Sequence, residues 1–243
     1  MRRSKGLARG EQRNRHWCYD RDMLLPNPWV HLDASAPFVL PEDRALVERF
    51  NARASEAHGL RLDVLPEPFV GRPDAPVVLL ALNPGYSDED PALHAVPSFA
   101  ARLRANLAHE PQPYPFYFLN PSNEGSGRRW WRRKLKALLD EFPEVRVAEA
   151  LLCVEYFPYH SRIYKSSAPL LPSQEYGFEL VRSAVARGAV VVAMRARRVW
   201  CAAIPQLELP GRLLSLRNPQ NVAVSLRNCP DGFERIRSAV AAV

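Results

Sequence analysis

The sequence predicts an α/β protein: a three-layer α/β/α sandwich around a central, mainly parallel sheet of four strands. Two observations favour this class. Apolar runs of strand length recur at residues 77–82, 150–157 and 189–194, and apart from Glu155 they are apolar throughout rather than alternating. Segments with helical spacing lie between them. Continuously apolar strands that alternate with helices are typical of a parallel sheet that is covered on both faces.

Each expected helix is marked by its periodicity or by its first and last residues. The first begins with acidic residues, places Leu46 and Phe50 on one face and stops at Gly59. Ser173 is expected to cap a later helix. The expected helices are 41–59, 97–108, 127–141, 173–188, 197–204 and a last one opened by Asp231.

The final strand allows two interpretations. Residues 212–216 and 221–225 both have strand character, and they flank the turn-like stretch 217–220, "RNPQ". We expect these two runs to form a hairpin. Residues 221–225 would then be the last strand, because loop and terminal helix follow them directly.

Composition limits the classes of protein to consider. The chain has 243 residues, 47% of them hydrophobic, and a formal net charge of +7. No apolar run is long enough to span a membrane, and the basic N-terminus lacks the apolar stretch of a secretory signal. The four scattered cysteines form no close pair, which favours free thiols in the cytoplasm. We divide the chain into a basic arm plus helix, 1–65, and an α/β domain, 66–243.

An asparagine and a tight turn follow the strand at 77–82, in the sequence Asn83-Pro84-Gly85. Because sites in open parallel sheets form beyond the carboxyl ends of strands, we expect a site here, with Tyr86 beside it. The alternative is an ordinary turn, for which these residue types are common. No Gly-Lys-Ser/Thr follows, so this is no phosphate-binding loop.

The order of motifs over residues 70–243 resembles the uracil-DNA glycosylase superfamily, and most closely its mismatch-specific and single-strand-selective branches. Those branches place Asn-Pro-Gly after the first core strand and a Pro-Phe pair downstream, here Pro115-Phe116, ahead of an aromatic-rich helix. The resemblance implies their fold and a monofunctional DNA N-glycosylase. It also implies that Asn83 positions the attacking water and that Phe116 stacks on the base. Phe118 is the reserve candidate.

The chemistry explains why such residues are needed. Cleavage of a base from deoxyribose passes through a sugar cation and an anionic leaving base. The enzyme therefore needs an extruded base, a positioned water and stabilisation of charge. An asparagine carbonyl can hold a water without a tuned pKa, and Pro84, Gly85 and Tyr86 would line the base pocket beside it.

A strongly basic stretch, "RRWWRRK" at 128–134, puts two indoles among cations. The DNA interpretation lets Arg128, Arg129, Arg132 and Arg133 hold phosphates, which would give affinity that weakens with salt. The alternative is an amphipathic helix with a solvated cationic face. Three further cations, Arg195, Arg197 and Arg198, should add charge to the same edge.

A second family motif, His-Pro-Ser or Asn-Pro-Ser, follows the last core strand in the resembling proteins. Here it could be read at Asn218 or at Asn228, and the expected hairpin favours Asn228. Ser225, Arg227 and Asn228 would then line the site, with Leu226 as a wedge. Neither alternative contains a histidine, so we expect weak activity on ordinary uracil.

Glu155 stands where the single-strand-selective branch has a base-reading asparagine. An ionised carboxylate only accepts hydrogen bonds, so it would repel the uracil carbonyl unless it became protonated. The alternative is that Glu155 is salt-bridged to an arginine. Nearby His160 could contact base or phosphate, or could be an ordinary hydrogen-bonded loop residue.

We therefore expect a cytoplasmic, monomeric glycosylase that acts on a damaged or deaminated base in DNA. We expect no metal, no cofactor and no membrane partner. The alternatives are a non-catalytic nucleic-acid-binding relative and a hydrolase of free nucleosides.

Overall fold

A five-stranded sheet forms the centre of the protein in the computed structural model, which describes residues 25–243. The spatial order is β1-β3-β2-β4-β5. Strands β3, β2, β4 and β5 are mutually parallel, and β1 pairs antiparallel with β3 at one edge. The strands are β1 (Phe69–Gly71), β2 (Val77–Leu80), β3 (Leu151–Val154), β4 (Val190–Ala193) and β5 (Leu213–Ser215).

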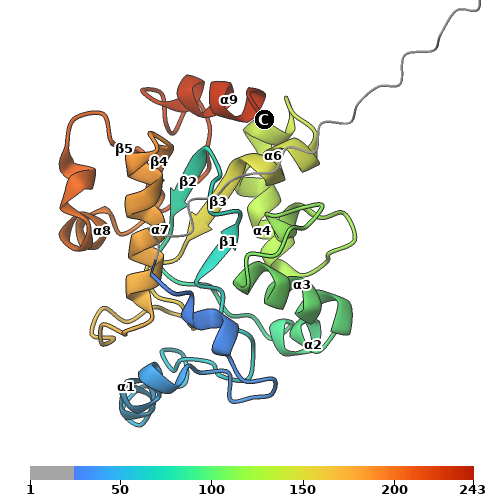
Figure 1. Cartoon of the computed structure of the whole chain (residues 1–243), viewed down its shortest axis with the longest axis vertical. Coiled ribbons are helices and arrows are strands. Elements are labelled where there is room, and N and C mark those ends of the chain that lie inside the picture. The colour runs from blue at the N-terminus through green and yellow to red at the C-terminus, as the bar shows by residue number, and fades with distance from the viewer. Residues whose placement is uncertain (1–24) are drawn as a thin grey trace, which may run out of the picture.

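Helices surround this sheet, with α7 on one side and α3 and α4 on the other side of the view in Figure 1. The α-helices are α1 (Pro41–Asn51), α2 (Asp90–His94), α3 (Pro97–Leu107), α4 (Ser126–Lys134), α5 (Lys136–Leu139), α6 (Glu144–Ala150), α7 (Gln174–Ala186), α8 (Arg197–Ala203) and α9 (Phe233–Ala241). Short 3₁₀ turns are η2 (Pro28–His31), η3 (Tyr117–Leu119) and η4 (Pro205–Glu208).

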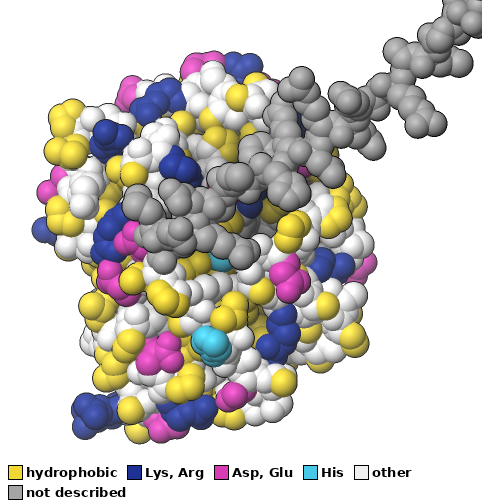
Figure 2. Space-filling view, viewed as in Figure 1, with side chains coloured by type: hydrophobic (Ala, Val, Ile, Leu, Met, Phe, Trp, Pro, Cys, Tyr) yellow, Lys and Arg dark blue, Asp and Glu magenta, His cyan; other side chains and the backbone are white. Residues whose placement is uncertain are grey.

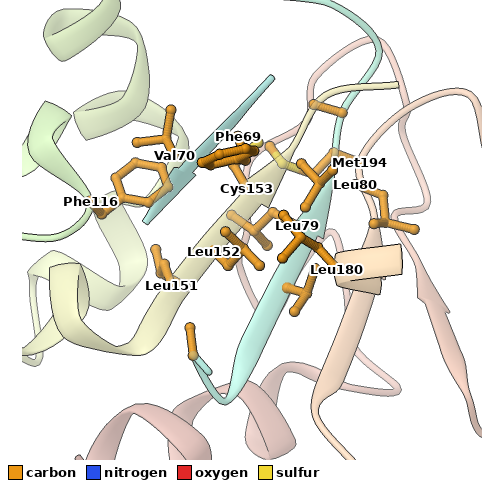
Figure 3. Packing of buried hydrophobic residues seen from close by; sticks show 14 of the residues in the cluster. Phe69, Val70, Leu79, Leu80, Phe116, Leu151, Leu152, Cys153, Leu180 and Met194 are labelled. Carbon is orange, nitrogen blue, oxygen red and sulfur yellow. The ribbon is translucent and has the colours of Figure 1, made fainter. Parts of the chain in front are cut away.

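Every residue of β2, β3 and β4 is buried, so both faces of the central sheet are covered. Figure 3 shows Leu79 and Leu152 packed in the sheet with Leu180 of α7 beside them. Burial on both faces explains why these strands read as continuous apolar runs. The predicted α/β class with a mainly parallel sheet is therefore confirmed.

The sheet has five strands rather than the expected four. The unpredicted strand, β1, is only three residues long, which is too short for any periodicity to mark. Phe69 pairs with Val154, and Gly71 pairs with Leu152. A Cβ on Gly71 would lie 2.1 Å from the Leu151 carbonyl oxygen, so only glycine allows this strand to approach so closely.

The predicted hairpin at 212–225 is wrong. Residues 213–215 form β5 and pair parallel with β4, whereas residues 221–225 belong to no strand. The reason lies in hydrogen bonding: the Asn228 side-chain amide donates to the carbonyls of Asn221 and Ala223. The Val224 N–H donates to the Lys134 carbonyl at the end of α4. These bonds use backbone groups that residues 221–225 would need in order to pair with β5 as a strand.

Two predicted helices are shorter than expected. The helix predicted over 41–59 ends at Asn51, because the Asn51 side chain turns back and bonds both the N–H and the carbonyl of Leu60. The helix predicted over 127–141 is divided at Leu135 into α4 and α5. The prediction omitted α2 and α6.

Residues 25–65 share the hydrophobic core of the sheet. Trp29, Leu40 and Val47 are buried in the same cluster as the strands. The basic residues of 1–24, together with Cys18, lie outside the described residues, whereas Cys153, Cys201 and Cys229 are buried free thiols. Across 25–243, no helix combines the length and apolarity needed to cross a membrane.

Candidate functional site

A cavity of about 660 Å³ lies beyond the carboxyl ends of the three central strands. Asn83 follows β2, Glu155 follows β3 and Arg195 follows β4, and all three line the cavity. The chain runs from β2 to β3 on one side and places β4 on the other side of β2. Such a reversal leaves a crevice at the strand ends, where ligands of open α/β sheets bind.

The Asn83 side chain has a defined orientation. Its Nδ2 donates to the Pro84 carbonyl at 2.9 Å and to the Ser161 hydroxyl at 3.0 Å. Because a backbone carbonyl only accepts, the atom that faces Pro84 must be the amide nitrogen. The opposite atom, Oδ1, accepts no hydrogen bond from any described residue. Asn83 therefore offers the cavity a free acceptor with a fixed direction.

The rest of the Asn83-Pro84-Gly85 turn also lines the cavity. The Pro84 carbonyl accepts the Ser161 N–H, and the Gly85 carbonyl receives Nδ1 of His160 at 2.6 Å. The turn is therefore held by the loop that follows β3. A simple connecting turn does not need these additional hydrogen bonds, so they favour the interpretation of the turn as part of a site.

Tyr86 forms part of the cavity wall next to this turn. Two guanidinium groups lie over its ring, that of Arg61 at 4.2 Å and that of Arg162 at 5.2 Å from the ring centroid. Its hydroxyl donates to Asp63 at 3.3 Å. Cation–π contacts on Tyr86 thus fix the ring at the cavity wall.

Two histidines and a glutamate cluster at the base of the cavity. Glu67, His94 and His160 place potential ligand atoms within 4.8 Å of one another. Nδ1 of His94 accepts the Leu65 N–H, so the ring proton must lie on Nε2, 4.0 Å from Glu67. Burial, with His160 as a smaller cause, lowers the pKa of His94 to about 3. His94 is therefore neutral.

His160 is bonded differently. Both of its ring nitrogens lie at hydrogen-bond distance from backbone carbonyl oxygens, Nδ1 at 2.6 Å from that of Gly85 and Nε2 at 3.1 Å from that of Leu65. The backbone therefore engages both ring nitrogens of His160 and Nδ1 of His94, whereas Nε2 of His94 faces Glu67.

Glu155 is the most perturbed carboxyl of the cavity. Burial raises its pKa to about 8; Glu67 also raises it, while Arg195, the Cys153 thiol and the Leu82 backbone act in the opposite direction. Its Oε2 is buried without a hydrogen-bond partner in the described chain. The predicted alternative, a salt bridge to an arginine, is absent from the ion pairs of residues 25–243.

The aromatic side chains divide into two groups. Phe118, Trp130 and Trp131 line the cavity, whereas Phe116 does not. Phe116 is fully buried and lies edge-on to Trp131 at 4.9 Å, next to Val70 in Figure 3. The reserve candidate, Phe118, is thus the better placed of the two phenylalanines. A Cβ on Gly127 would lie 2.4 Å from the Phe118 ring, so this glycine gives the ring its room.

The four arginines of α4 are not equivalent. Arg128 and Arg132 form ion pairs with Glu144, and Arg129 pairs with Glu89. Arg128 also donates to the carbonyl of Asn120. These three cations have acidic partners in the described structure.

Arg133, by contrast, lines the cavity, as does Arg195. Neither makes an ion pair with a described residue. Burial lowers the pKa of the neighbouring Lys134, and Arg133 and Arg195 lower it further. These three cations therefore lie close together without an acidic partner. Over the face shown in Figure 2, by contrast, basic and acidic side chains are interspersed.

The segment after the last strand is held by Asn228. Its Oδ1 accepts the Asn218 N–H, and its side chain is buried. Ser225, Arg227 and Asn228 are not among the described residues that line the cavity. Because the last strand is β5, Asn218 is the asparagine that follows the sheet directly. Leu226 is 56% exposed on this loop.

Sequence reasoning missed Glu67, His94, Ser161 and Trp130 as cavity residues. Ser161 directly follows His160 at a predicted strand end, which was a usable signal. Glu67 and His94 lie outside any recognisable motif. Comparison of the chain with protein-family models, with curated proteins and with solved structures finds no match.

Proposed function

We propose that this protein is a DNA glycosylase that hydrolyses the N-glycosidic bond of a damaged or deaminated base. The observation that carries the proposal is Asn83: an amide fixed by Pro84 and Ser161, whose free oxygen lines a cavity at the strand ends. This is the group that a metal-independent hydrolysis needs to hold a water. The proposal includes the finer fold, that of the uracil-DNA glycosylases, for which the parallel central strands and the motif after β2 give support.

The proposed reaction uses the cavity in three ways. The extruded base enters the cavity, where Phe118 and the indoles offer surfaces for stacking. A water accepted by Oδ1 of Asn83 lies ready to add at C1′ of the sugar. The unpaired cations Arg133 and Arg195 stabilise the negative charge that appears on the leaving base and on nearby phosphates.

The unpaired cations favour a polymeric substrate over a free nucleoside. Three close positive charges without acidic partners destabilise the folded chain unless an anion binds there. A nucleic-acid backbone supplies several anions together, whereas an unphosphorylated nucleoside supplies none. The exposed Leu226 lies two residues after Val224, which is bonded to Lys134 at this edge, and Leu226 is the proposed wedge.

The test is a cleavage screen over oligonucleotides that carry uracil, hypoxanthine, xanthine or alkylated bases, in single and double strands, followed by alkaline treatment. We expect cleavage of at least one substrate by the native protein. Asn83→Ala should lower the rate on it by about 10²-fold or more, because a positioning group is lost. Affinity for the same oligonucleotide should stay within a few-fold.

Asn120→Ala serves as the matched control, since Asn120 is an asparagine outside the cavity lining. It should leave the rate unchanged. Full activity in Asn83→Ala would contradict the proposed role of Asn83. DNA binding without cleavage of any substrate would instead support the non-catalytic alternative, and cleavage of free nucleosides alone would support a nucleoside hydrolase.

A further inference from the structure

Two carboxyl groups meet at the β3 side of the cavity. The Glu155 N–H donates to the Pro68 carbonyl at 2.9 Å, and the Glu67 N–H donates to the Pro158 carbonyl at 3.1 Å. These bonds continue the antiparallel pairing of β1 and β3 beyond Val154, so the chain segments that carry the two glutamates run side by side. Both side chains line the cavity.

The two carboxyls lack the cationic partners that usually hold a buried anion. Oε1 of Glu155 has a long contact with the Cys153 thiol, at 3.9 Å, and its Oε2 has no hydrogen-bond partner among the described residues. The Leu82 backbone lowers the pKa of Glu155 only slightly. Glu67 lies 4.0 Å from Nε2 of His94, which is neutral, and the nearby Tyr117 hydroxyl lowers the pKa of Glu67. A buried carboxyl resists ionisation, and once one of two neighbouring carboxyls has ionised, the other keeps its proton to a higher pH.

The surrounding titratable groups act on the two carboxyls in both directions. Cys153 and Tyr117 are buried and uncharged, because burial and the two glutamates raise the pKa of each well above its usual value. Burial raises the pKa of Glu67, and Asp90 adds to this effect, while His160 and Tyr117 lower it. Arg195 and, less strongly, the Cys153 thiol lower the pKa of Glu155.

We propose that Glu155 is the general acid of this pocket and that Glu67 is the positioning residue that keeps it protonated. The inference rests on the proposed glycosidic reaction. In the step, the C1′–N bond breaks, the proton of the Glu155 carboxyl passes to the leaving base, and the oxygen of water bonds to C1′. The proton released by the water returns the Glu155 carboxylate to its acid form through solvent. Atoms and charges balance without an oxidant or a metal.

The inference narrows the substrate class. The base must present an acceptor, a carbonyl oxygen or an unprotonated ring nitrogen, to the carboxyl of Glu155. The protonated carboxyl also keeps one acceptor oxygen, so it can read a neighbouring N–H as an amide would. Bases that leave poorly as anions gain most from such a proton, since they otherwise depart with their full negative charge.

The first test measures rate against pH on the substrate found in the cleavage screen. The rate should fall above about pH 8, where Glu155 loses its proton. Glu155→Gln should lower the rate by roughly 10²–10⁴-fold, the usual contribution of a general acid, and should remove the alkaline fall. A substrate with an electron-withdrawing group on the base should recover much of that loss, because its base leaves without protonation.

Glu67→Gln separates positioning from catalysis. It removes the neighbouring negative charge, so the alkaline fall should move to lower pH while the maximal rate stays within a few-fold. Glu89→Gln, an exposed glutamate paired with Arg129 at the surface, should leave the profile unchanged. The side-chain carboxyl carbon resonances of Glu155 and Glu67 can be assigned by comparison with the two variants. In Glu67→Gln, the Glu155 resonance should titrate at a lower pH than in the native protein, even without substrate.

The outcomes separate this inference from the proposed function. If the native protein cleaves DNA but Glu155→Gln keeps its rate within about two-fold, the general acid is disproved and the glycosylase stands. If no base is cleaved, both fail. A Glu155 resonance that titrates at the usual pH of a glutamate, in a folded and active protein, also overturns the inference.

Discussion

Two buried carboxyls in this protein have opposite surroundings. Asp43 of α1 is fully buried and accepts hydrogen bonds from the Tyr159 hydroxyl at 2.8 Å and from the Ser173 N–H at 3.1 Å. Burial raises the pKa of Asp43, while the bonds from Ser173 and Tyr159 lower it. Asp43 therefore joins α1 to the loop after β3 and to the start of α7.

Glu155 has no such set of donors. Its Oε2 is buried without a partner among the described residues, and the Glu155 residue lines the cavity. The difference teaches how to separate a structural acid from a functional one. A carboxyl whose lone pairs are satisfied stabilises the fold, whereas one left unsatisfied in a cavity is arranged for a ligand.

The largest expected effect is on the pH dependence of stability. In the unfolded chain Glu155 ionises near its usual 4.5, but in the folded chain it keeps its proton until about pH 8. The stabilisation is fully present below 4.5 and is lost as the pH rises to about 8. The free energy of unfolding should fall by at most about 5 kcal/mol across this window.

Denaturant unfolding at a series of pH values tests this expectation. Glu155→Gln should flatten the dependence and should be more stable than the native protein at pH 8. The surface variant Glu89→Gln should keep the native slope. If Glu155→Gln keeps the native slope of unfolding free energy against pH, the Glu155 carboxyl of the native protein is solvated. The contrast with Asp43 would then be removed.

Removal of the Asp43 carboxyl should lower the stability of the protein, whereas Glu155→Gln should raise it at pH 8. Asp43→Ala leaves the Tyr159 hydroxyl and the Ser173 N–H without their acceptor, and each unpaired buried group costs about 1–3 kcal/mol. We expect the free energy of unfolding at pH 7 to fall by about 2–4 kcal/mol. The rate per folded molecule should stay unchanged, and a large loss of rate without loss of stability would place Asp43 in the site instead.

The smallest expected effect compares paired with unpaired cations. Arg133→Gln and Arg195→Gln should each flatten the slope of log affinity against log salt by about one unit, as one phosphate contact is lost. Arg129→Gln is the matched control from the same helix, because Arg129 already pairs with Glu89. Equal slopes for the three variants would show that the ion pairs of α4 do not select which arginines bind DNA.

The sequence by itself determined the central strands and the place of the cavity. The runs at β2, β3 and β4 are apolar on both faces, so neighbouring residues alone identify them. The positions of Asn83 and Glu155 at the cavity follow from these strands, because parallel strands bring their carboxyl ends to one edge of the sheet.

Only the tertiary structure decided which neighbours each segment has. β5 pairs with β4 rather than with residues 221–225, and β1 exists because it can pair with β3. The choice of Phe118 over Phe116, and of Arg133 over the other arginines of α4, likewise depends on residues distant in the chain. The physical reason is that pairing, side-chain direction and ion pairing are fixed by contacts between distant segments, which no local pattern of residues records.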